Sequence, residues 1–314
     1  VTFDRDATVA NVYQTANELV AALKGELYSA TLTLRRKSDD AKETFNLAND
    51  NVAIAIAGFL LDGTSPTEFL KGLETIEASY TADAIDQYGI PFALAGDLVF
   101  QMAAPSDDEI AAAKAAFLNY LEGEVDEIDV AEVVIDGENI TVTFDRDATV
   151  ANVYQTANEL VAALKGELYS ATLTLKRKSD DAEEAFDLAD GNVAIAIAGF
   201  LLDGTSPTEF LKGLETIEAI YTAEAIDQDG IPFTLAGDLV FQMAAPSDED
   251  IATAKAAFMN KLKGEVAEID VADVVIDENE NITVTFDRDA EPADVLQTAN
   301  ELVAALKGEL YSAT

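Results

Sequence analysis

The stretch Val1–Asp6 reads Val-Thr-Phe-Asp-Arg-Asp, and the same six residues recur at Val142–Asp147 and at Val284–Asp289. The residues after each copy are repeated as well, so the 314-residue chain holds two full units and a third that stops at Thr314. Solenoid repeats are only about 20–45 residues long, whereas these copies begin at positions 1, 142 and 284. Each unit is therefore predicted to be a globular domain rather than one layer of a stack.

The repeat places unit 1 at 1–141, unit 2 at 142–283 and a partial unit 3 at 284–314. The first two units differ mostly where a surface is expected, as where Lys42 becomes Glu183, while the periodic apolar positions are nearly unchanged. Recent duplication is the simplest explanation of such similarity. We therefore expect a longer natural protein with further copies, of which this chain is a window.

The composition is strongly acidic and lacks several reactive side chains. There are 60 acidic against 19 basic residues, a net charge of −41, and no His, Cys or Trp. Catalytic triads, Cys/His zinc sites and disulfides are thereby excluded. A nucleic-acid partner is excluded as well, because phosphate binding needs clustered Lys and Arg. Apolar residues make up 49% of the chain, enough for ordinary cores, but no run reaches the ~18 needed to span a membrane.

A strand pair is predicted where two units meet. Ile140–Asp147 alternates apolar and polar side chains, which is typical of a half-buried strand. Val130–Asp136 alternates too, and the link between them suits a turn. A hairpin is therefore predicted across 130–147, with its counterpart across 271–289. Because these hairpins cross the unit boundaries, the structural domains are expected to be offset from the sequence units.

The remaining elements of unit 1 follow from periodicity and capping signals. We predict a helix over 12–27, a strand over 30–36 with a short partner over 41–47, and an apolar segment over 52–61 that suits a helix close to the sheet. A second helix is predicted to begin at the Ser65 capping box, with an apolar stripe that reaches Tyr80. A strand over 90–102, broken at Gly96, follows it, and a third helix runs from Ser106 to about Gly123.

Hairpins that alternate with helices favour the α+β class. We predict tandem near-identical domains, each a largely antiparallel sheet of about five to six strands covered by about three helices. A split β-α-β arrangement, as in ferredoxin-like folds, is the leading expectation.

Calcium is the first candidate ligand of so acidic a chain, and Asp277–Asn281 offers oxygen atoms at alternate positions, as an EF-hand loop does. The glycine of that motif is missing, however, and its twelfth position is Arg288. The segment is interpreted as a solvated acidic turn. The metal site stays unassigned, with weak calcium or other cation binding through separate loops as the open alternative.

Other chemical signals are weak, and no catalytic or cofactor-binding residue is predicted. Carboxylate pairs could hydrolyse glycosides, but no pocket signature surrounds any of them. The basic run Arg35–Lys37 could hold an anion, although pairing with acidic residues across the following turn is favoured. Tyr13, Tyr28 and Tyr80 are interpreted as core or core-edge residues rather than as a sugar-binding platform.

The function expected from these observations is structural: a tandem-repeat region of a large secreted or cell-surface protein, acting as a stalk, fibre or matrix element. Surface carboxylates would keep a row of such domains hydrated and prevent neighbouring copies from coaggregating. The alternative is a multivalent adhesion module for a carbohydrate, a surface or a small apolar ligand. An enzyme is not expected.

The expected partners are other copies of the unit, within the chain or head-to-tail. Residues 1–31 and 284–314 are copies of one β-α segment, so three such segments flank two intervening regions. An exposed strand edge invites pairing with another chain. We therefore expect consecutive units to share or exchange this segment.

Overall fold

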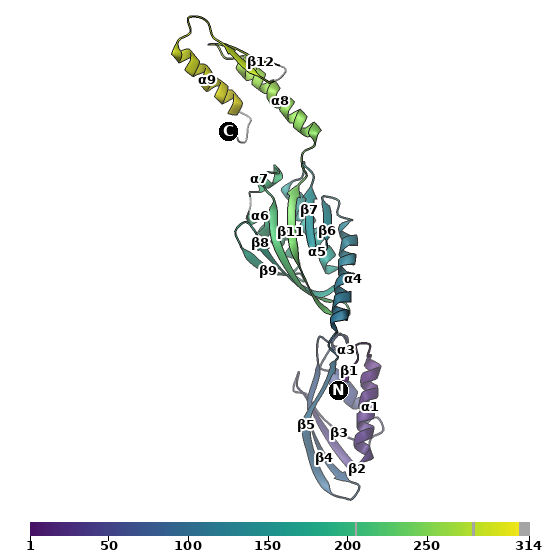
Figure 1. Cartoon of the computed structure of the whole chain (residues 1–314). Coiled ribbons are helices and arrows are strands. Elements are labelled where there is room, and N and C mark those ends of the chain that lie inside the picture. Colours follow the sequence, from purple (N-terminus) through teal and green to yellow (C-terminus); the bar gives the residue numbers. More distant parts are fainter. Residues whose placement is uncertain (205, 278–279, 308–314) are drawn as a thin grey trace. The chain divides into compact units, whose positions relative to one another are not determined.

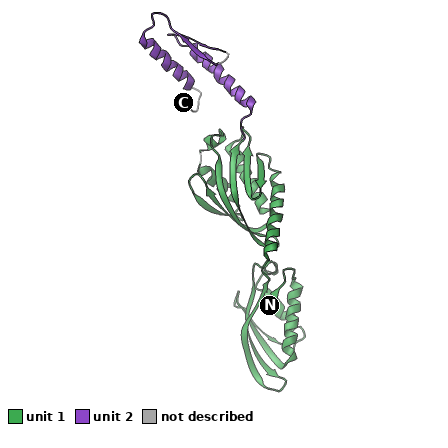
Figure 2. Ribbon diagram, viewed as in Figure 1, with its two compact units in different colours: residues 1–243 green, residues 244–314 purple. Residues whose placement is uncertain are grey.

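The computed structural model describes residues 1–204, 206–277 and 280–307, and it is a mixed α+β structure. The chain divides into two compact units, one ending at Met243 and the other beginning at Ala244 (Figure 2). Each unit is described by itself below. The α+β class predicted from the sequence is confirmed.

The first sheet is built by the N-terminal hundred or so residues (Figure 1). Its strand order is β1 (Thr2–Phe3), β5 (Pro91–Met102), β4 (Ile76–Asp86), β2 (Leu27–Arg36) and β3 (Lys42–Asn46). The pairing of β1 with β5 is parallel, and the other pairings are antiparallel. The helices of this region are α1 (Val9–Gly25), α2 (Val52–Leu61) and the short α3 (Pro66–Leu70).

The second sheet repeats this order with one more strand at its edge. The order is β6 (Glu132–Asp136), β7 (Asn139–Phe144), β11 (Pro232–Met243), β10 (Ile217–Asp227), β8 (Leu168–Arg177) and β9 (Glu183–Asp187). Strands β7 and β11 are parallel, and the remaining neighbours are antiparallel. Its helices are α4 (Asp107–Val125), α5 (Val150–Lys165), α6 (Val193–Asp203) and α7 (Pro207–Leu211).

The unit that begins at Ala244 is small. It comprises α8 (Asp248–Val266), the antiparallel pair β12 (Asp273–Ile276) and β13 (Ile282–Thr285), and α9 (Pro292–Lys307). Leu262, Val266 and Ile269 form its buried cluster.

The second sheet shows why these segments become strands. Along β10, every second side chain from Ile217 to Ala225 is buried, as expected for a strand with one face on a core. The rings of Phe144, Phe210 and Phe241 pack beneath the sheet, with centroids 5.8–6.0 Å apart. Helices α5 and α6 pack on each other, and each also contacts the sheet.

The predicted β6–β7 hairpin is confirmed, with Val133 opposite Val142. The capped helix expected from Ser106 is confirmed as α4: Ser106 and Glu109 form a reciprocal capping box at its N-terminus. The strand over 30–36 and its short partner are confirmed as β2 and β3.

Two local predictions are wrong. The helix expected from Ser65 to Tyr80 ends at Leu70, because Gly72 adopts a φ of +76° and the residues from Ile76 onward alternate with the period of a strand. The break expected at Gly96 is absent, since β5 is continuous there. Gly96 lies opposite Tyr80 in the sheet, and the Tyr80 ring would be 3.1 Å from any Cβ at position 96.

The ferredoxin-like expectation is also wrong. From β7 onward the element order is β-α-β-β-α-α-β-β, whereas the split β-α-β fold has one strand after its second helix. The difference arises because the long hairpin β10–β11 follows α7, and β11 returns to pair in parallel with β7. The expectation of a largely antiparallel sheet is confirmed.

Candidate functional site

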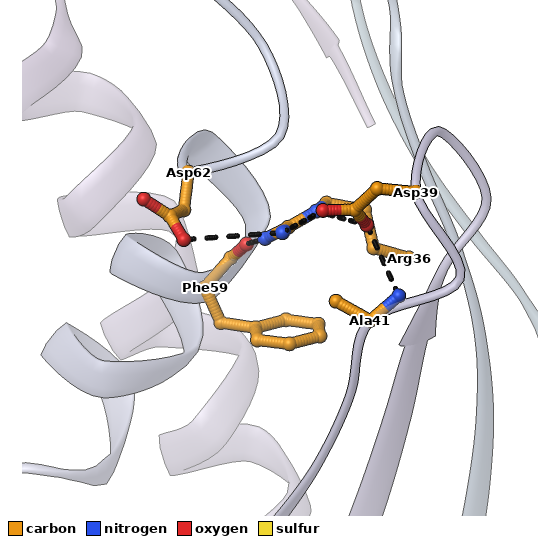
Figure 3. Close-up of polar contacts among 5 residues, drawn as sticks. All are labelled: Arg36, Asp39, Ala41, Phe59 and Asp62. Carbon is orange, nitrogen blue, oxygen red and sulfur yellow. Dashed lines mark hydrogen bonds and ion pairs between the residues drawn. The ribbon is translucent and has the colours of Figure 1, made fainter.

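The most elaborate polar cluster surrounds Arg36, the last residue of β2. Alternation along the strand puts Arg36 on the buried face with Leu32 and Leu34, and its side chain is only 6% exposed. Its Nε and Nη2 atoms donate to the two carboxylate oxygens of Asp39, with 2.9 Å between Nε and Oδ1. Nη1 donates to the backbone oxygen of Phe59 near the end of α2 (Figure 3). The guanidinium thus joins the turn after β2 to the end of a helix.

The same guanidinium is supported from two further sides. Its Cζ lies 4.9 Å from the ring centroid of Phe59, a cation–π arrangement, and Nη2 is 3.8 Å from Asp62. Asp39 in turn accepts a hydrogen bond from the Ala41 amide at 3.1 Å. The hydrogen bonds from Arg36 and from that amide lower the pKa of Asp39, and the bond to Asp39 raises the pKa of Arg36. The positive charge of Arg36 is therefore held by partners within the chain.

The second sheet contains the same cluster 141 residues later. Arg177 is also 6% exposed at its side chain, and its Nε donates to Asp180 at 2.9 Å. Nη1 donates to the backbone oxygen of Phe200, and Cζ lies 4.8 Å from the centroid of the Phe200 ring. The arrangement is therefore a property of the repeated sequence.

The basic run Arg35–Lys37 is thus paired within the chain. The two arginines pair across the following turn, as the favoured interpretation expected, but Lys37 pairs with acidic residues of other strands. Arg35 is 2.8 Å from Asp40, and Lys37 is 3.4 Å from Asp97. An open recess of about 470 Å³ lies beside Arg36, and one of about 480 Å³ lies beside Arg177. Both are lined by polar and acidic groups, such as Glu77 in the first.

A glycine is required at each position where the side chain of Arg36 or Arg177 passes over the end of a helix. A Cβ at position 204 would lie 2.1 Å from Nε of Arg177, whereas one at position 199 would meet nothing within 4 Å. We expect Gly204→Ala to lower the free energy of unfolding by about 1–3 kcal/mol, because the locked guanidinium has to move. Gly199→Ala, in the middle of α6, is the control and should raise stability by up to about 1 kcal/mol. Chemical denaturation measures both, and equal effects would contradict the assigned role of Gly204.

The pKa shift of Asp180 predicts a pH dependence. Arg177 and the Ala182 amide hydrogen-bond to Asp180 and lower its pKa in the folded state. The stabilisation is therefore fully present above about pH 4, the ordinary range of aspartate, and is lost as the pH falls through the lower folded-state pKa. We expect the stability difference between the wild type and Asp180→Asn to shrink as the pH is lowered from 5 to 2. Urea titrations across this range measure it, and a difference that is constant with pH would contradict the pairing.

The first sheet also carries an apolar groove that the sequence analysis did not anticipate. A cavity of about 310 Å³ opens between α1 and the sheet, and its apolar lining includes Leu19, Leu23, Leu94, Leu98 and Phe100. Leu19 and Leu23, which have the spacing of an apolar stripe on a helix, are each 37% exposed, and Leu94 is 42% exposed.

The equivalent groove of the second sheet is filled by α4. Helix α4 packs on α5, β6 and β11, and the ring of Phe117 lies 5.4 Å from that of Phe233. The residues that match Leu19, Leu23 and Leu94 are consequently almost fully buried: Leu160 at 6%, Leu164 at 8% and Leu235 at 1% exposure. Among the described residues, no helix covers this face of the first sheet as α4 covers the second.

The remaining candidates do not form a site. Tyr13 and Tyr80 are half-buried, as predicted, but the prediction for Tyr28 is wrong, because it is 83% exposed at the start of β2. Within the described part of the chain, no three acidic side chains cluster closely enough to hold a metal ion. Positions 278 and 279 of the Asp277–Asn281 segment lie outside the described residues.

Comparisons with known proteins give no family. No family model and no curated protein matches the chain. A solved structure from a study of kinesin mutants and activation of the motor ATPase has a TM-score of 0.20 and 10% identity, over 72% of this chain and 88% of that one, which is too low to support an argument. None of the described helices combines the length and the apolar character needed to cross a membrane.

Proposed function

We propose that this chain is a structural tandem-repeat region of a large secreted or cell-surface protein, a stalk or fibre element that carries mechanical load. The observation that carries the proposal is the parallel pairing of β7 with β11 in the second sheet. Once tension along the chain has detached α4 and β6, it pulls β7 from its N-terminal end and β11 from its C-terminal end. Because the strands are parallel, their backbone hydrogen bonds are loaded together, in shear, rather than one after another.

The proposed domain is Asp107–Met243, offset from the sequence units as the boundary hairpin suggests. Support comes from the repetition of sequence, strand order and arginine cluster. The cluster around Arg177 ties a turn to a helix end. Such internal ties suit a domain whose task is to keep its shape.

The acidity of the chain supports an extracellular or cell-surface location. The net charge of −41 is carried by the repeated sequence itself rather than by a tail. Like-charged domains in a row repel one another and stay soluble at the high local concentration that a tandem array imposes. Screening by salt outside the cell moderates that repulsion.

A multivalent adhesion module is the second candidate. The polar recess beside Arg36 recurs beside Arg177, and a recess present in each repeat is what avidity for a polar ligand such as a carbohydrate requires. The apolar groove gives no such support, because its counterpart in the second sheet is filled by α4.

Single-molecule force spectroscopy of the full chain tests the mechanical proposal. Stretching from the two chain ends should give a cooperative event whose contour length increases by roughly 37 nm, as about 3.5 Å per residue implies for residues 139–243. The matched control pulls the second sheet through cysteines introduced at Thr172 and Asp187, which face each other at the open end of the β8–β9 hairpin. This geometry separates the hydrogen bonds one at a time.

We expect the end-to-end geometry to withstand a severalfold higher force than the hairpin geometry. Equal forces, or a lower force from the chain ends, would overturn the load-carrying role. A carbohydrate that binds both recesses, in a chain with low end-to-end resistance, would favour the adhesion module instead.

A further inference from the structure

Two parts of the compact unit that ends at Met243 are in direct contact: the first-sheet region, residues 1–102, and the second-sheet region, residues 107–243. The chain between them is short. The Ala103 amide still donates to the backbone oxygen of Phe3 in β1, and Ser106 already caps α4. Between these two residues, Pro105 restricts the backbone. The connection itself thus limits how far the two regions move apart.

Arg5 links the two regions through its guanidinium. Nη1 donates to the backbone oxygen of Lys71 at 3.1 Å, within the first-sheet region. Nη2 donates to the backbone oxygen of Asp229 at 2.9 Å, in the turn between β10 and β11 of the second-sheet region. Arg146 makes the corresponding bond to the backbone oxygen of Lys212. The bond to Lys71 therefore belongs to the repeated fold, and it positions Arg5 to reach the neighbouring turn.

Tyr169, near the start of β8, contacts the end of α3. Its hydroxyl donates to Oε1 of Glu68 at 3.1 Å, and Nζ of Lys71 lies 4.8 Å from the centroid of its ring, a cation–π arrangement. The hydrogen bond to Glu68 raises the pKa of Tyr169. The hydroxyl thus stays protonated at neutral pH and remains a donor.

The closest approach of the two regions is at Gly230. This residue has a φ of +77° in the β10–β11 turn, and a Cβ there would lie 2.6 Å from the Cβ of Lys71 and closer still to its backbone oxygen. Gly89 occupies the same place in the turn of the first sheet, with a φ of +80°, but a Cβ there would meet nothing within 4 Å. Gly230 therefore serves both its turn and the contact with Lys71.

The side chains that make these contacts recur in the other repeat. Arg146, Glu209 and Lys212 match Arg5, Glu68 and Lys71, and Tyr28 and Gly89 match Tyr169 and Gly230. Asp229 is replaced by Tyr88, but this position contributes only its backbone oxygen. The two surfaces that meet are therefore part of the repeated sequence.

We propose that these contacts form a stiff joint, in which Arg5 and the end of α3 bind the β10–β11 turn and the start of β8 in the adjacent repeat. The joint holds the two regions in one orientation, so that the chain resists bending between its domains. Each contact is small, but the short connection keeps the effective concentration of the two surfaces high. This inference rests on the proposed structural role and names the surface through which adjacent repeats act as one body.

A distance measurement within the intact chain tests the joint. The chain has no cysteine, so Glu43→Cys and Glu184→Cys, at matching exposed positions of β3 and β9, give two unique thiols for nitroxide labels. Double electron–electron resonance then measures the distribution of distances between the two regions. We expect one narrow distribution. A broad distribution in the labelled chain with no other substitution would overturn the proposal.

Gly230→Asn disrupts the closest contact and keeps the turn, because asparagine tolerates a positive φ. The distance distribution should become severalfold broader. The matched control is Gly89→Asn, which places the same residue in the same backbone conformation with open surroundings and should leave the distribution unchanged. Circular dichroism checks that both variants fold. Equal distributions in the two variants would contradict the contact at Lys71.

A pair of double variants gives a second readout. Arg5→Gln with Tyr169→Phe removes the hydrogen bonds to Asp229 and Glu68 and should also broaden the distribution. Arg146→Gln with Tyr28→Phe makes the same substitutions at the matching positions outside this joint and should leave the distribution narrow. A distribution that stays narrow in both double variants would show that these contacts do not hold the joint.

The two proposals fail in different ways. A broad distance distribution with high end-to-end mechanical resistance would keep the load-carrying second sheet and remove only the stiff joint. A narrow distribution with low resistance would remove the load-carrying role and keep the joint.

Discussion

We expect Phe117→Ala to lower the free energy of unfolding of the second-sheet region by about 3–5 kcal/mol. Phe117 is 3% exposed, and its ring packs against Phe233 at 5.4 Å and against Tyr120 at 6.3 Å. Truncation removes buried apolar surface and leaves a cavity that the sheet, held by its backbone hydrogen bonds, cannot close. Helix α4 has few other buried side chains of this size, so truncation of Phe117 weakens the whole contact between α4 and the sheet.

The chain contains its own matched control. Phe258 occupies the same position in α8, but it is only half-buried and packs on a small cluster. Phe258→Ala should leave the second sheet unaffected. Hydrogen exchange of the β10 amides in increasing denaturant measures the first effect at its location. Equal losses of β10 protection in both variants would contradict the assignment of α4 to the second sheet.

The second large effect is expected at Arg177. Arg177→Met should lower the free energy of unfolding of the same region by about 2–3 kcal/mol, because charge-assisted hydrogen bonds are lost and the backbone oxygen of Phe200 loses its donor. Methionine fills part of the space left by the arginine stem, so the loss reports mainly the polar contacts. The negative charge of Asp180 is half-exposed and therefore returns to water at little cost.

The neighbouring residue serves as the control for Arg177. Lys176 pairs with Asp181 at 2.9 Å, but both side chains are well exposed, at 44% and 82%. Exposed ion pairs contribute little to stability, so Lys176→Met should have a much smaller effect. Urea denaturation followed by circular dichroism compares the two variants. If they lose the same stability, the buried cluster has no special role.

Local elements with strong sequence signals could be predicted. The alternation in Ile140–Asp147 and the turn before it identified a hairpin, and the Ser106 capping box identified the start of α4. Both depend on contacts within a few residues, which the sequence shows directly. The prediction for the segment after Leu70 was wrong because the spacing of Ile76 and Tyr80 suits a helix as well as a strand. Only the pairing of this segment with β2 and β5 decides between the two.

The candidate sites were harder to predict from the sequence than these local elements. The pairing of the basic run with nearby carboxylates was foreseen, because Arg36 and Asp39 are three residues apart. The third partner, the backbone oxygen of Phe59, is 23 residues from Arg36 and could not be foreseen. The groove was missed because Leu19 and Leu23 have the spacing of a buried stripe. Whether such a stripe is covered depends on a helix that belongs to a distant part of the chain.

The sequence by itself determined the repeat, the acidity, the absence of His and Cys chemistry, and the α+β class, because these are properties of composition and of short periodic patterns. Only the tertiary structure decided that β7 pairs in parallel with β11 and that α4 closes the second sheet. Each of these joins segments about a hundred or fewer residues apart by burying apolar surface. Burial of that kind selects among arrangements that local patterns leave equally acceptable.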